Sequence, residues 1–443
     1  MRAMKDSGIP WIGEIPEGWN VCRVKDVALL YNGNSIKDEE KENYTNDTNA
    51  YPYISTKDID AVYQTIDYTN GLYTKVDDSY FKIAHSGCSL MCIEGGSAGK
   101  KKAFVERSVS FVNKLCCFSP YRIEGKFLFH YLCSPNFEME FNKYVTGLIG
   151  GVSVSTLKNF IALVPPLAEQ QRIAEFLDRK CAEVDEMIAL QEQIIEEFKA
   201  YKQSVITEAV TKGLNPDVPM KDSGIEWIGQ IPEHWEIAKL SILFSFKGGY
   251  AFDSSDFRLD GTNQVVRIGN VKNDSLLLDA SPVYISNEIA FKAQKFKLEK
   301  GQILFTMTGT KGKRDYFYTL LLKDNHFSDK ELYLNQRVGC FIGKDRVYTE
   351  YYNYLLKDKH ILDAIFLYET GTANQGNLGI ESIKQTKVQF PPLAEQQAIA
   401  DYLGEKCGEI DKLIATKQQK IDSLKEYKKS IIYEYVTGKK EIA

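Results

Sequence analysis

Two long stretches of the chain place apolar residues at helical spacing. Between residues 168 and 212 a seam recurs every seventh position, and the neighbours three and four residues away are mostly apolar. The seam positions of this stretch are Leu177, Val184, Gln191, Phe198 and Val205. The second stretch repeats them at Leu403, Ile410, Lys417, Leu424 and Ile431. The pattern predicts two helices of forty-odd residues, each preceded by a proline pair and followed by a glycine.

A single amphipathic helix of this length cannot bury its apolar seam alone. The nearest partner for each helix is its own duplicate, so we expect the two to pack as an antiparallel coiled coil. The seam is polar near its midpoint in both copies, at Gln191 and Lys417. Antiparallel packing predicts a contact between these two side chains that fixes the register. The alternative is that both residues merely tolerate exposure.

The helices are one part of a longer duplication. VPPLAEQQRIAEFLDRK at 164–180 returns as FPPLAEQQAIADYLGEK at 390–406. A repeated head precedes each half, because MKDSGIPWIGEIPEGW at 4–19 returns as MKDSGIEWIGQIPEHW at 220–235 with three of sixteen positions changed. The repeat therefore indicates two copies of one structural unit. The predicted parts are a first domain at 1–164, a spacer helix at 165–213, a second domain at 214–390 and a second spacer helix at 391–443.

The blocks between the repeated segments, about 20–163 and 236–389, diverge in sequence. They carry short runs of Tyr, Phe, Val and Ile broken by Gly, Asn and Asp, which predicts strands and turns, with a helix near 126–144 and another near 349–368. Weak echoes, such as YVTG at 144–147 and YETG at 368–371, indicate one fold with different surfaces. We expect an α+β protein in which two antiparallel helices hold two similar, mainly β domains apart with pseudo-twofold symmetry.

Composition sets limits on function. The net charge is −5 at pH 7, and no run of eighteen apolar residues occurs, so we expect no membrane span and a cytoplasmic location. The nine cysteines form no CxxC pair and the five histidines are scattered, which predicts free, mostly buried thiols and no metal site. GGSAGKK and GTKGKR do not fit the phosphate-loop pattern, and HExxH and GxSxG are absent, so we predict no catalytic residue.

Glycine-flanked basic loops recur at the same place in both divergent blocks, within 89–104 and 303–317. Glycine lets a backbone approach closely, hydroxyls bond phosphates or base edges, and Lys or Arg neutralise phosphates or read guanine. The alternative for each is a solvated hairpin tip, and recurrence in two divergent blocks favours the DNA-binding interpretation. The predicted DNA-binding residues are Ser97, Lys100, Lys101, Lys102, Thr310, Lys311, Lys313 and Arg314.

All the tryptophans lie in the repeated heads, at Trp11, Trp19, Trp227 and Trp235. We expect them to pack each head against its domain and against the end of the opposite helix. Plain core packing is the alternative.

Taken together, these residues resemble the DNA-specificity subunit of Type I restriction–modification systems. The duplicated PPLAEQQ segments with their helices carry most of the resemblance, supported by the KDSGIxWIGxIPxxW heads and by GQILFTMTGTKGK with YLNQRVG in the second block. The resemblance covers nearly the whole chain. The first block departs from it, because FVNKLCC at 111–117 stands where the second has YLNQRVG.

The resemblance implies a non-catalytic subunit in which each divergent block is a target recognition domain for one half of a bipartite site on double-stranded DNA. It implies that the helices set the gap between the half-sites and that the repeated segments dock two methyltransferase subunits. Endonuclease or translocase subunits can join such a core. S-adenosylmethionine is expected on the methyltransferase, with no cofactor bound by this chain.

Two alternatives belong to other classes of protein. A coiled-coil adaptor that binds proteins without DNA specificity would account for the acidity and the duplication, but it leaves the recurring basic loops unexplained. An enzyme with an unrecognised site would show nuclease or methylase activity in the isolated chain.

A four-residue insertion near Gln191 tests whether the helices set the gap. It adds about one helical turn, roughly 6 Å, and we expect it to lengthen the nonspecific gap of the methylated sequence by one or two base pairs. Sequencing of methylated adenines in cells measures this, and an unchanged gap would contradict the prediction.

Overall fold

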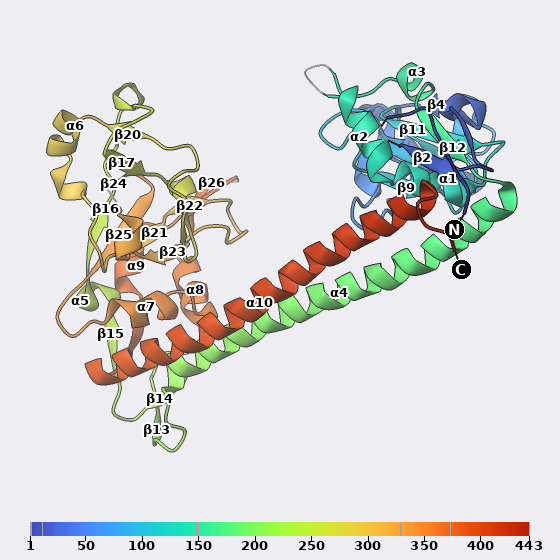
Figure 1. Cartoon of the computed structure of the whole chain (residues 1–443). Helices are drawn as coiled ribbons and strands as arrows, with labels where there is room; N and C mark the ends of the chain where they lie inside the picture. Colours follow the sequence, from blue (N-terminus) through green and yellow to red (C-terminus); the bar gives the residue numbers. More distant parts are fainter. Residues whose placement is uncertain (1, 11, 147–149, 328–329, 373, 443) are drawn as a thin grey trace. The chain divides into compact units, whose positions relative to one another are not determined.

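A computed structural model describes residues 2–10, 12–146, 150–327, 330–372 and 374–442. Contacts divide the chain into two compact units (Figure 1). Unit 1 contains residues 1–194 and 417–443, and unit 2 contains residues 195–416. The long helices α4 (Leu167–Lys212) and α10 (Leu393–Val436) pack antiparallel, and each contributes one end to each unit. The predicted α+β fold, with two β-rich domains and two long antiparallel helices, is confirmed.

Unit 1 is built on two four-stranded sheets. The first runs β4-β11-β8-β9 and is antiparallel throughout, and the second runs β6-β5-β10-β7 with β5 and β10 parallel. The strands of the first sheet are β4 (Ala28–Asn32), β8 (Ser89–Cys92), β9 (Lys102–Phe104) and β11 (Leu115–Pro120). Those of the second are β5 (Ala50–Ile54), β6 (Tyr73–Lys75), β7 (Ile83–Ala84) and β10 (Val109–Phe111).

Unit 2 repeats the strand order of the first sheet, and its second sheet has one strand fewer than that of unit 1. Its first sheet runs β16-β25-β21-β23, and its second runs β20-β17-β24 with β17 and β24 parallel. The strands of the first sheet are β16 (Phe244–Gly248), β21 (Ile303–Thr306), β23 (Thr319–Leu321) and β25 (Val338–Gly343). Those of the second are β17 (Asn263–Val266), β20 (Tyr284–Ile285) and β24 (Glu331–Leu334), and a separate pair is formed by β18 (Val271–Lys272) and β19 (Ser275–Leu276).

The chain leaves the first sheet of each unit at a glycine. A Cβ at Gly33 would lie 1.8 Å from the carbonyl oxygen of Phe111, and one at Gly249 would lie 1.9 Å from that of Asn335. Only glycine permits such an approach of two backbones. The same local requirement thus survives in two blocks whose sequences otherwise differ.

The domain helices differ from their prediction in one respect. Each predicted helix is two helices, α1 (Gly125–Leu132) and α2 (Pro135–Lys143) in unit 1, and α7 (Thr349–Leu355) and α8 (Lys359–Phe366) in unit 2. The break has the same cause in both, because the side chains of Ser134 and Asp358 accept backbone N–H groups and cap the second helix. The shorter helices are α3 (Val154–Leu157), α5 (Leu240–Leu243), α6 (Asn287–Lys292) and α9 (Ile380–Gln385).

The repeated heads form matching hairpins. Strands β1 (Met4–Asp6) and β2 (Glu14–Pro16) pair in the same register as β13 (Met220–Asp222) and β14 (Gln230–Pro232). After the first head the chain enters β3 (Asn20–Arg23), which pairs with β12 (Ile161–Val164). After the second head it enters β15 (Glu236–Lys239), which pairs with β28 (Lys387–Phe390). These pairs bring the start and the end of each domain together, directly before its long helix.

The PPLAEQQ segments fasten the long helices to the domains. The amide of Gln396, fully buried, donates to the carbonyl oxygens of Pro391 and Arg346 and accepts the N–H of Tyr348 at 2.8 Å, where α7 begins. Gln170 makes matching bonds to Pro165 and to Glu124, where α1 begins.

The tryptophans hold the heads to both long helices. The indole N–H of Trp19 donates to Glu169 at 3.1 Å, and that of Trp235 donates to Glu395 at 2.9 Å, in the first turn of α4 and α10 respectively. A Cβ at Gly438 would lie 3.2 Å from the ring of Trp19, and one at Gly213 would lie 3.2 Å from that of Trp235. The predicted packing against the opposite helix end is confirmed for these two residues. Trp227 is partly buried, and Trp11 lies outside the described residues.

Each core includes the end of the helix from the other half of the repeat. In unit 1 the head residues Ile15 and Trp19 share a core with Ile432 and Val436 of α10. In unit 2 the head residues Ile231 and Trp235 share a core with Ile206 and Val210 of α4. Both halves of the sequence are therefore needed to complete either core.

The seam between the long helices has a register fixed by matching ion pairs. Lys428 binds Asp185 in unit 1 at 2.7 Å, and Lys202 binds Asp411 in unit 2 at 2.8 Å. The predicted seam residues Leu177, Val184, Gln191, Leu403 and Ile410 are buried, and Phe198, Lys417 and Leu424 are partly exposed.

This register argues against the predicted contact between Gln191 and Lys417. Moving six residues along each helix from the Asp185–Lys428 pair brings Gln191 level with Asp422, not with Lys417. Gln191 is instead buried with its side-chain oxygen unpaired.

Replacement of the buried glutamine tests how the helix start is held. Gln396→Leu leaves two carbonyls and the N–H of Tyr348 without their partner, and we expect it to destabilise unit 2 by about 2–4 kcal/mol. Gln397→Leu, at the exposed neighbouring position, is the matched control and should change stability little. Thermal unfolding checks both, and equal midpoints for the two variants would contradict the assignment.

Candidate nucleic-acid interface

The basic loop of unit 1 joins β8 to β9 and exposes only part of its predicted set. The backbone of Ser97 accepts the N–H groups of Lys100 and Lys101, which closes a tight turn. Gly99 packs against the ring of Phe141, where a Cβ would come within 2.7 Å of a ring carbon. Lys100 is exposed and Ser97 is partly exposed. DNA binding by these two residues stays a prediction.

Lys101 and Lys102 are directed into unit 1. The ammonium of Lys101 donates to the carbonyl oxygen of Thr56 at 2.8 Å. Lys102 is only 5% exposed and lines a cavity of about 450 Å³ together with Cys133 and Asp185. As placed, Lys102 offers almost no surface to a phosphate. Lys102 is the first residue of β9, and the first two residues of this strand are both buried, so its side chain lies inside unit 1.

The basic loop of unit 2 lies against a second element that the sequence analysis did not single out. This element is the hairpin of β26 (Thr370–Thr372) and β27 (Gln375–Asn377), and β22 (Thr308–Gly309) at the start of the loop pairs with β27. The YETG echo at 368–371 leads into β26. The echo was therefore a usable signal for this element, although it did not reveal the contact with the loop.

Glu369 fastens the loop to the hairpin. Its carboxylate accepts the N–H of Gly312 at 3.1 Å and the hydroxyl of Tyr316 at 2.7 Å. Burial and the adjacent carboxylate of Glu369 raise the pKa of Tyr316 well above its ordinary value, so the phenol stays a donor. A Cβ at Gly376 would lie 2.3 Å from the carboxylate of Glu369. Loop, hairpin and carboxylate are thus in direct contact.

The cations of the second loop differ in what they contact. Lys311 donates to the carbonyl oxygen of Gly371 at 3.1 Å, and Arg314 forms an ion pair with Asp363 of α8. Lys313 is exposed, and Thr310 is partly exposed with its N–H bonded to Asp315. Lys313 is therefore the cation of this loop best placed to neutralise a phosphate.

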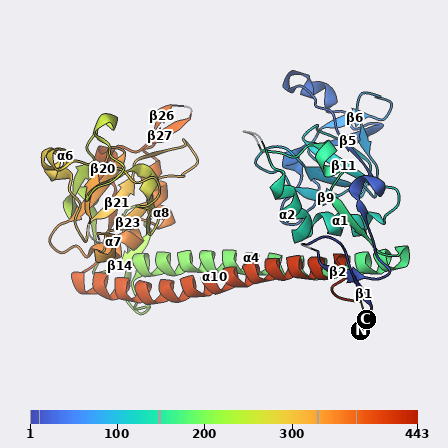
Figure 2. The same cartoon turned by 45° about the horizontal axis from the view of Figure 1, so that its top comes forward.

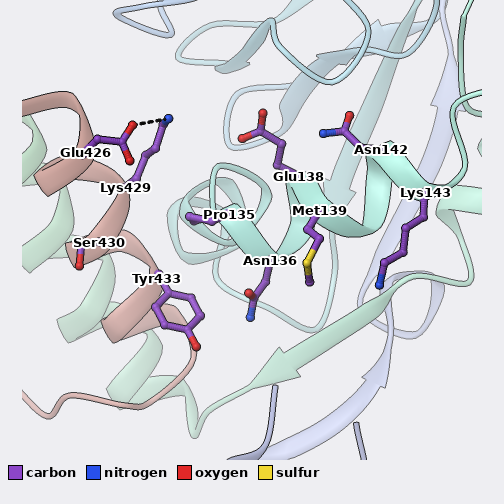
Figure 3. Close-up of a pocket in the computed structure, with 10 residues that line it drawn as sticks. All are labelled: Pro135, Asn136, Glu138, Met139, Asn142, Lys143, Glu426, Lys429, Ser430 and Tyr433. Carbon is purple, nitrogen blue, oxygen red and sulfur yellow. Dashed lines mark hydrogen bonds and ion pairs between the residues drawn. The ribbon is translucent and has the colours of Figure 1, made fainter. Parts of the chain in front are cut away.

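A broad groove of about 850 Å³ lies elsewhere in unit 1, between α2 and α10 (Figure 3). Met139 and Asn136 face it from α2, and Tyr433 and the paired Glu426 and Lys429 face it from α10. The equivalent helices of unit 2 are joined by a hydrogen bond from Thr207 to Asp358 at 2.5 Å. The groove shares no lining residue with the basic loops.

The described cysteines are mostly buried, and a hydrogen bond with Cys117 lowers the pKa of one of them, Cys88, to about 6. Eight of the nine free cysteines are buried, and Cys22 is partly exposed. Burial raises the pKa of Cys116, Cys181 and Cys340 to about 12, so these thiols stay protonated. Within the described ranges, no three His, Cys, Asp or Glu side chains are grouped as metal ligands. In the same part of the chain, no helix combines the length and apolar character that a membrane crossing requires.

The family model described as the Type I restriction modification DNA specificity domain matches residues 16–200 and again residues 232–426. One match falls on each half of the repeat, and the chain belongs to this family. It is a specificity subunit, the non-catalytic component of a Type I restriction enzyme, and it carries two target recognition domains.

Individual relatives extend over almost the full length. The MjaVIII specificity subunit of Methanocaldococcus jannaschii is 26% identical over 440 residues, covering 96% of this chain and 93% of the relative. The EcoKI specificity subunit of Escherichia coli K12 is 26% identical over 410 residues, covering 87% and 82%. A chain from a structure concerned with complex assembly and conformational transition of a type I R-M system has a TM-score of 0.69 at 16% identity, covering 95% and 98%. At this low identity, the similarity to this last chain is a similarity of fold alone.

Neutralising one lysine tests the role of the second loop. We expect Lys313→Gln to weaken DNA binding by a similar factor for every sequence and to reduce the slope of log affinity against log salt by about 1. Lys295→Gln, at an exposed position after α6, is the control and should leave the slope unchanged. DNA-binding titrations of the assembled complex over a range of salt concentrations measure this. A changed sequence preference in the Lys313→Gln variant would contradict a phosphate contact.

Proposed function

We propose that this chain reads a bipartite site on double-stranded DNA, with each target recognition domain reading one half. The observation that carries the proposal is the strand order of the first sheet, which occurs twice with different loops at the same place. One fold with two different surfaces suits two different half-sites. The first loop offers Ser97 and Lys100, whereas the second offers Lys313 beside an uncharged hairpin.

The partners proposed for the repeated surfaces are two identical methyltransferase subunits. Apolar side chains are exposed at equivalent positions of both long helices, which a protein without partners has little reason to repeat. Met187 and Leu413 are 50% and 46% exposed, and Tyr201 and Tyr427 are 57% and 52% exposed. Matching patches related by the duplication suit two copies of one partner.

In this proposal the methyltransferase and this chain have separate roles. S-adenosylmethionine is bound by the methyltransferase, and this chain supplies the sequence reading and the spacing of the two half-sites through α4 and α10. Endonuclease or translocase subunits are further partners that the family allows.

A block exchange tests the bipartite proposal. Residues 236–390 are replaced by the corresponding block of another specificity subunit, and the chimera is expressed with its methyltransferase. Sequencing of methylated adenines should show one half of the recognised sequence changed and the other half retained. A change in both halves would refute independent reading by the two domains.

A further inference from the structure

The hairpin of β26 and β27 adds a distinct surface to unit 2, outside its two main sheets (Figure 2). Thr372 pairs with Gln375 at its end, and Thr372, Asn374 and Gln375 are exposed. Because β22 pairs with β27, this end and the basic loop belong to one small sheet. Two exposed amide side chains therefore lie on the same element that supports the loop cations.

The chemistry of the hairpin differs from that of the loop. From Thr370 through Asn377 the chain has no charged residue, so this segment has no Coulomb attraction to phosphates. A carboxamide offers one acceptor and two donors, and Asn or Gln can bond N6 and N7 of adenine as a bidentate pair in the major groove. Amide side chains bond phosphates as well as base edges, but only the bonds to base edges carry sequence information, and this segment has no charge to draw it to the DNA backbone.

The hairpin is held firmly enough to orient these amides. Gly376 is buried, and a Cβ there would lie 2.8 Å from the hydroxyl of Tyr316 in addition to its approach to Glu369. A Cβ at Gly371 would lie 2.0 Å from the carbonyl oxygen of Gln375. Loop and hairpin therefore pack closely enough to require glycine at both positions, and a preformed surface loses little binding energy to ordering.

Two of the loop cations hold the loop against neighbouring elements of unit 2. Lys311 bonds the backbone of Gly371 in β26, and Arg314 bonds Asp363 at the base. All three loop cations are exposed, but the bonds of Lys311 and Arg314 to other elements of unit 2 give these two side chains a positioning role.

We propose that Asn374 and Gln375 are specificity-determining residues of the second domain, which read an adenine edge in its half-site. Lys313 holds an adjacent phosphate, and Lys311 and Arg314 brace the hairpin. This inference rests on the proposed function, since it assigns residues to one of the two half-sites. In the first domain the stretch between Thr146 and Gly151, which form a bridge, reads GLIG and has no amide; its residues 147–149 lie outside the described residues. The assignment is therefore made for the second half-site only.

The test uses the full chain assembled with its methyltransferase. Binding is measured on duplexes in which each base pair of the methylated sequence is replaced singly, for the wild type and for Asn374→Ala/Gln375→Ala. We expect discrimination to fall by about 5- to 150-fold at one or two adjacent positions, the range for one bidentate pair. All of these positions should lie in one half-site, with the other half read as before.

A second variant and a control make the outcome decisive. Asn374→Asp/Gln375→Glu keeps the side-chain volumes but removes the donors, so the preference at the same position should move away from adenine. Asn325→Ala, at an exposed asparagine in the short 3-10 helix Asp324–His326 of unit 2, should keep the wild-type preference.

Three results would overturn the inference. One is an unchanged preference in both hairpin variants. Another is weakening by the same factor for all sequences with a reduced salt slope, which would make the hairpin a phosphate contact. The third is altered reading in both halves. If the wild-type complex itself shows no sequence preference in either half, the proposed function fails instead.

Discussion

Neither recognition domain closes its hydrophobic core with its own half of the duplicated sequence. Trp19 and its neighbours in unit 1 pack on the last turns of α10, and Trp235 and its neighbours in unit 2 pack on the last turns of α4. An amphipathic helix of more than forty residues must also bury its stripe somewhere, and its duplicate supplies that surface. The antiparallel pairing of the long helices is the constraint on which both cores depend.

That constraint explains which parts of the sequence repeat closely. Glu169 and Glu395 receive the indole N–H of a head tryptophan, and Gln170 and Gln396 bind the start of a domain helix. These contacts need particular side chains in fixed positions, so both copies keep them. The solvent-exposed loops do not need particular side chains in fixed positions to keep the sheets beneath them folded. A specificity subunit can thus keep one scaffold and carry two different reading surfaces.

Much of the fold could be predicted from the sequence because its signals are periodic or repeated. The seven-residue spacing gave the long helices, and the duplication gave two domains of one kind. The predictions that the structure argues against depend on contacts between distant segments. Lys102 looked like part of an exposed basic cluster, yet it faces a cavity beside α10. Gln191 and Lys417 matched by position in the repeat, whereas the Asp185–Lys428 ion pair sets another register.

The candidate site was predictable only in part, because it too depends on contacts between segments that are distant in the sequence. Composition drew attention to the basic loop of unit 2, but an uncharged hairpin sixty residues later carries no such signal. The contact of Glu369 with Gly312 and Tyr316 joins the two, and it exists only in the folded chain. The cations therefore indicated the region, and the folded structure decides that Lys311 bonds β26 and that Arg314 pairs with Asp363.

We propose that this chain presents two equivalent docking surfaces on a single scaffold. Native mass spectrometry of this chain with an excess of its methyltransferase subunit measures that directly. We expect a complex of one chain with two copies of the methyltransferase. A complex that saturates at one copy, or a chain that binds none, would contradict it.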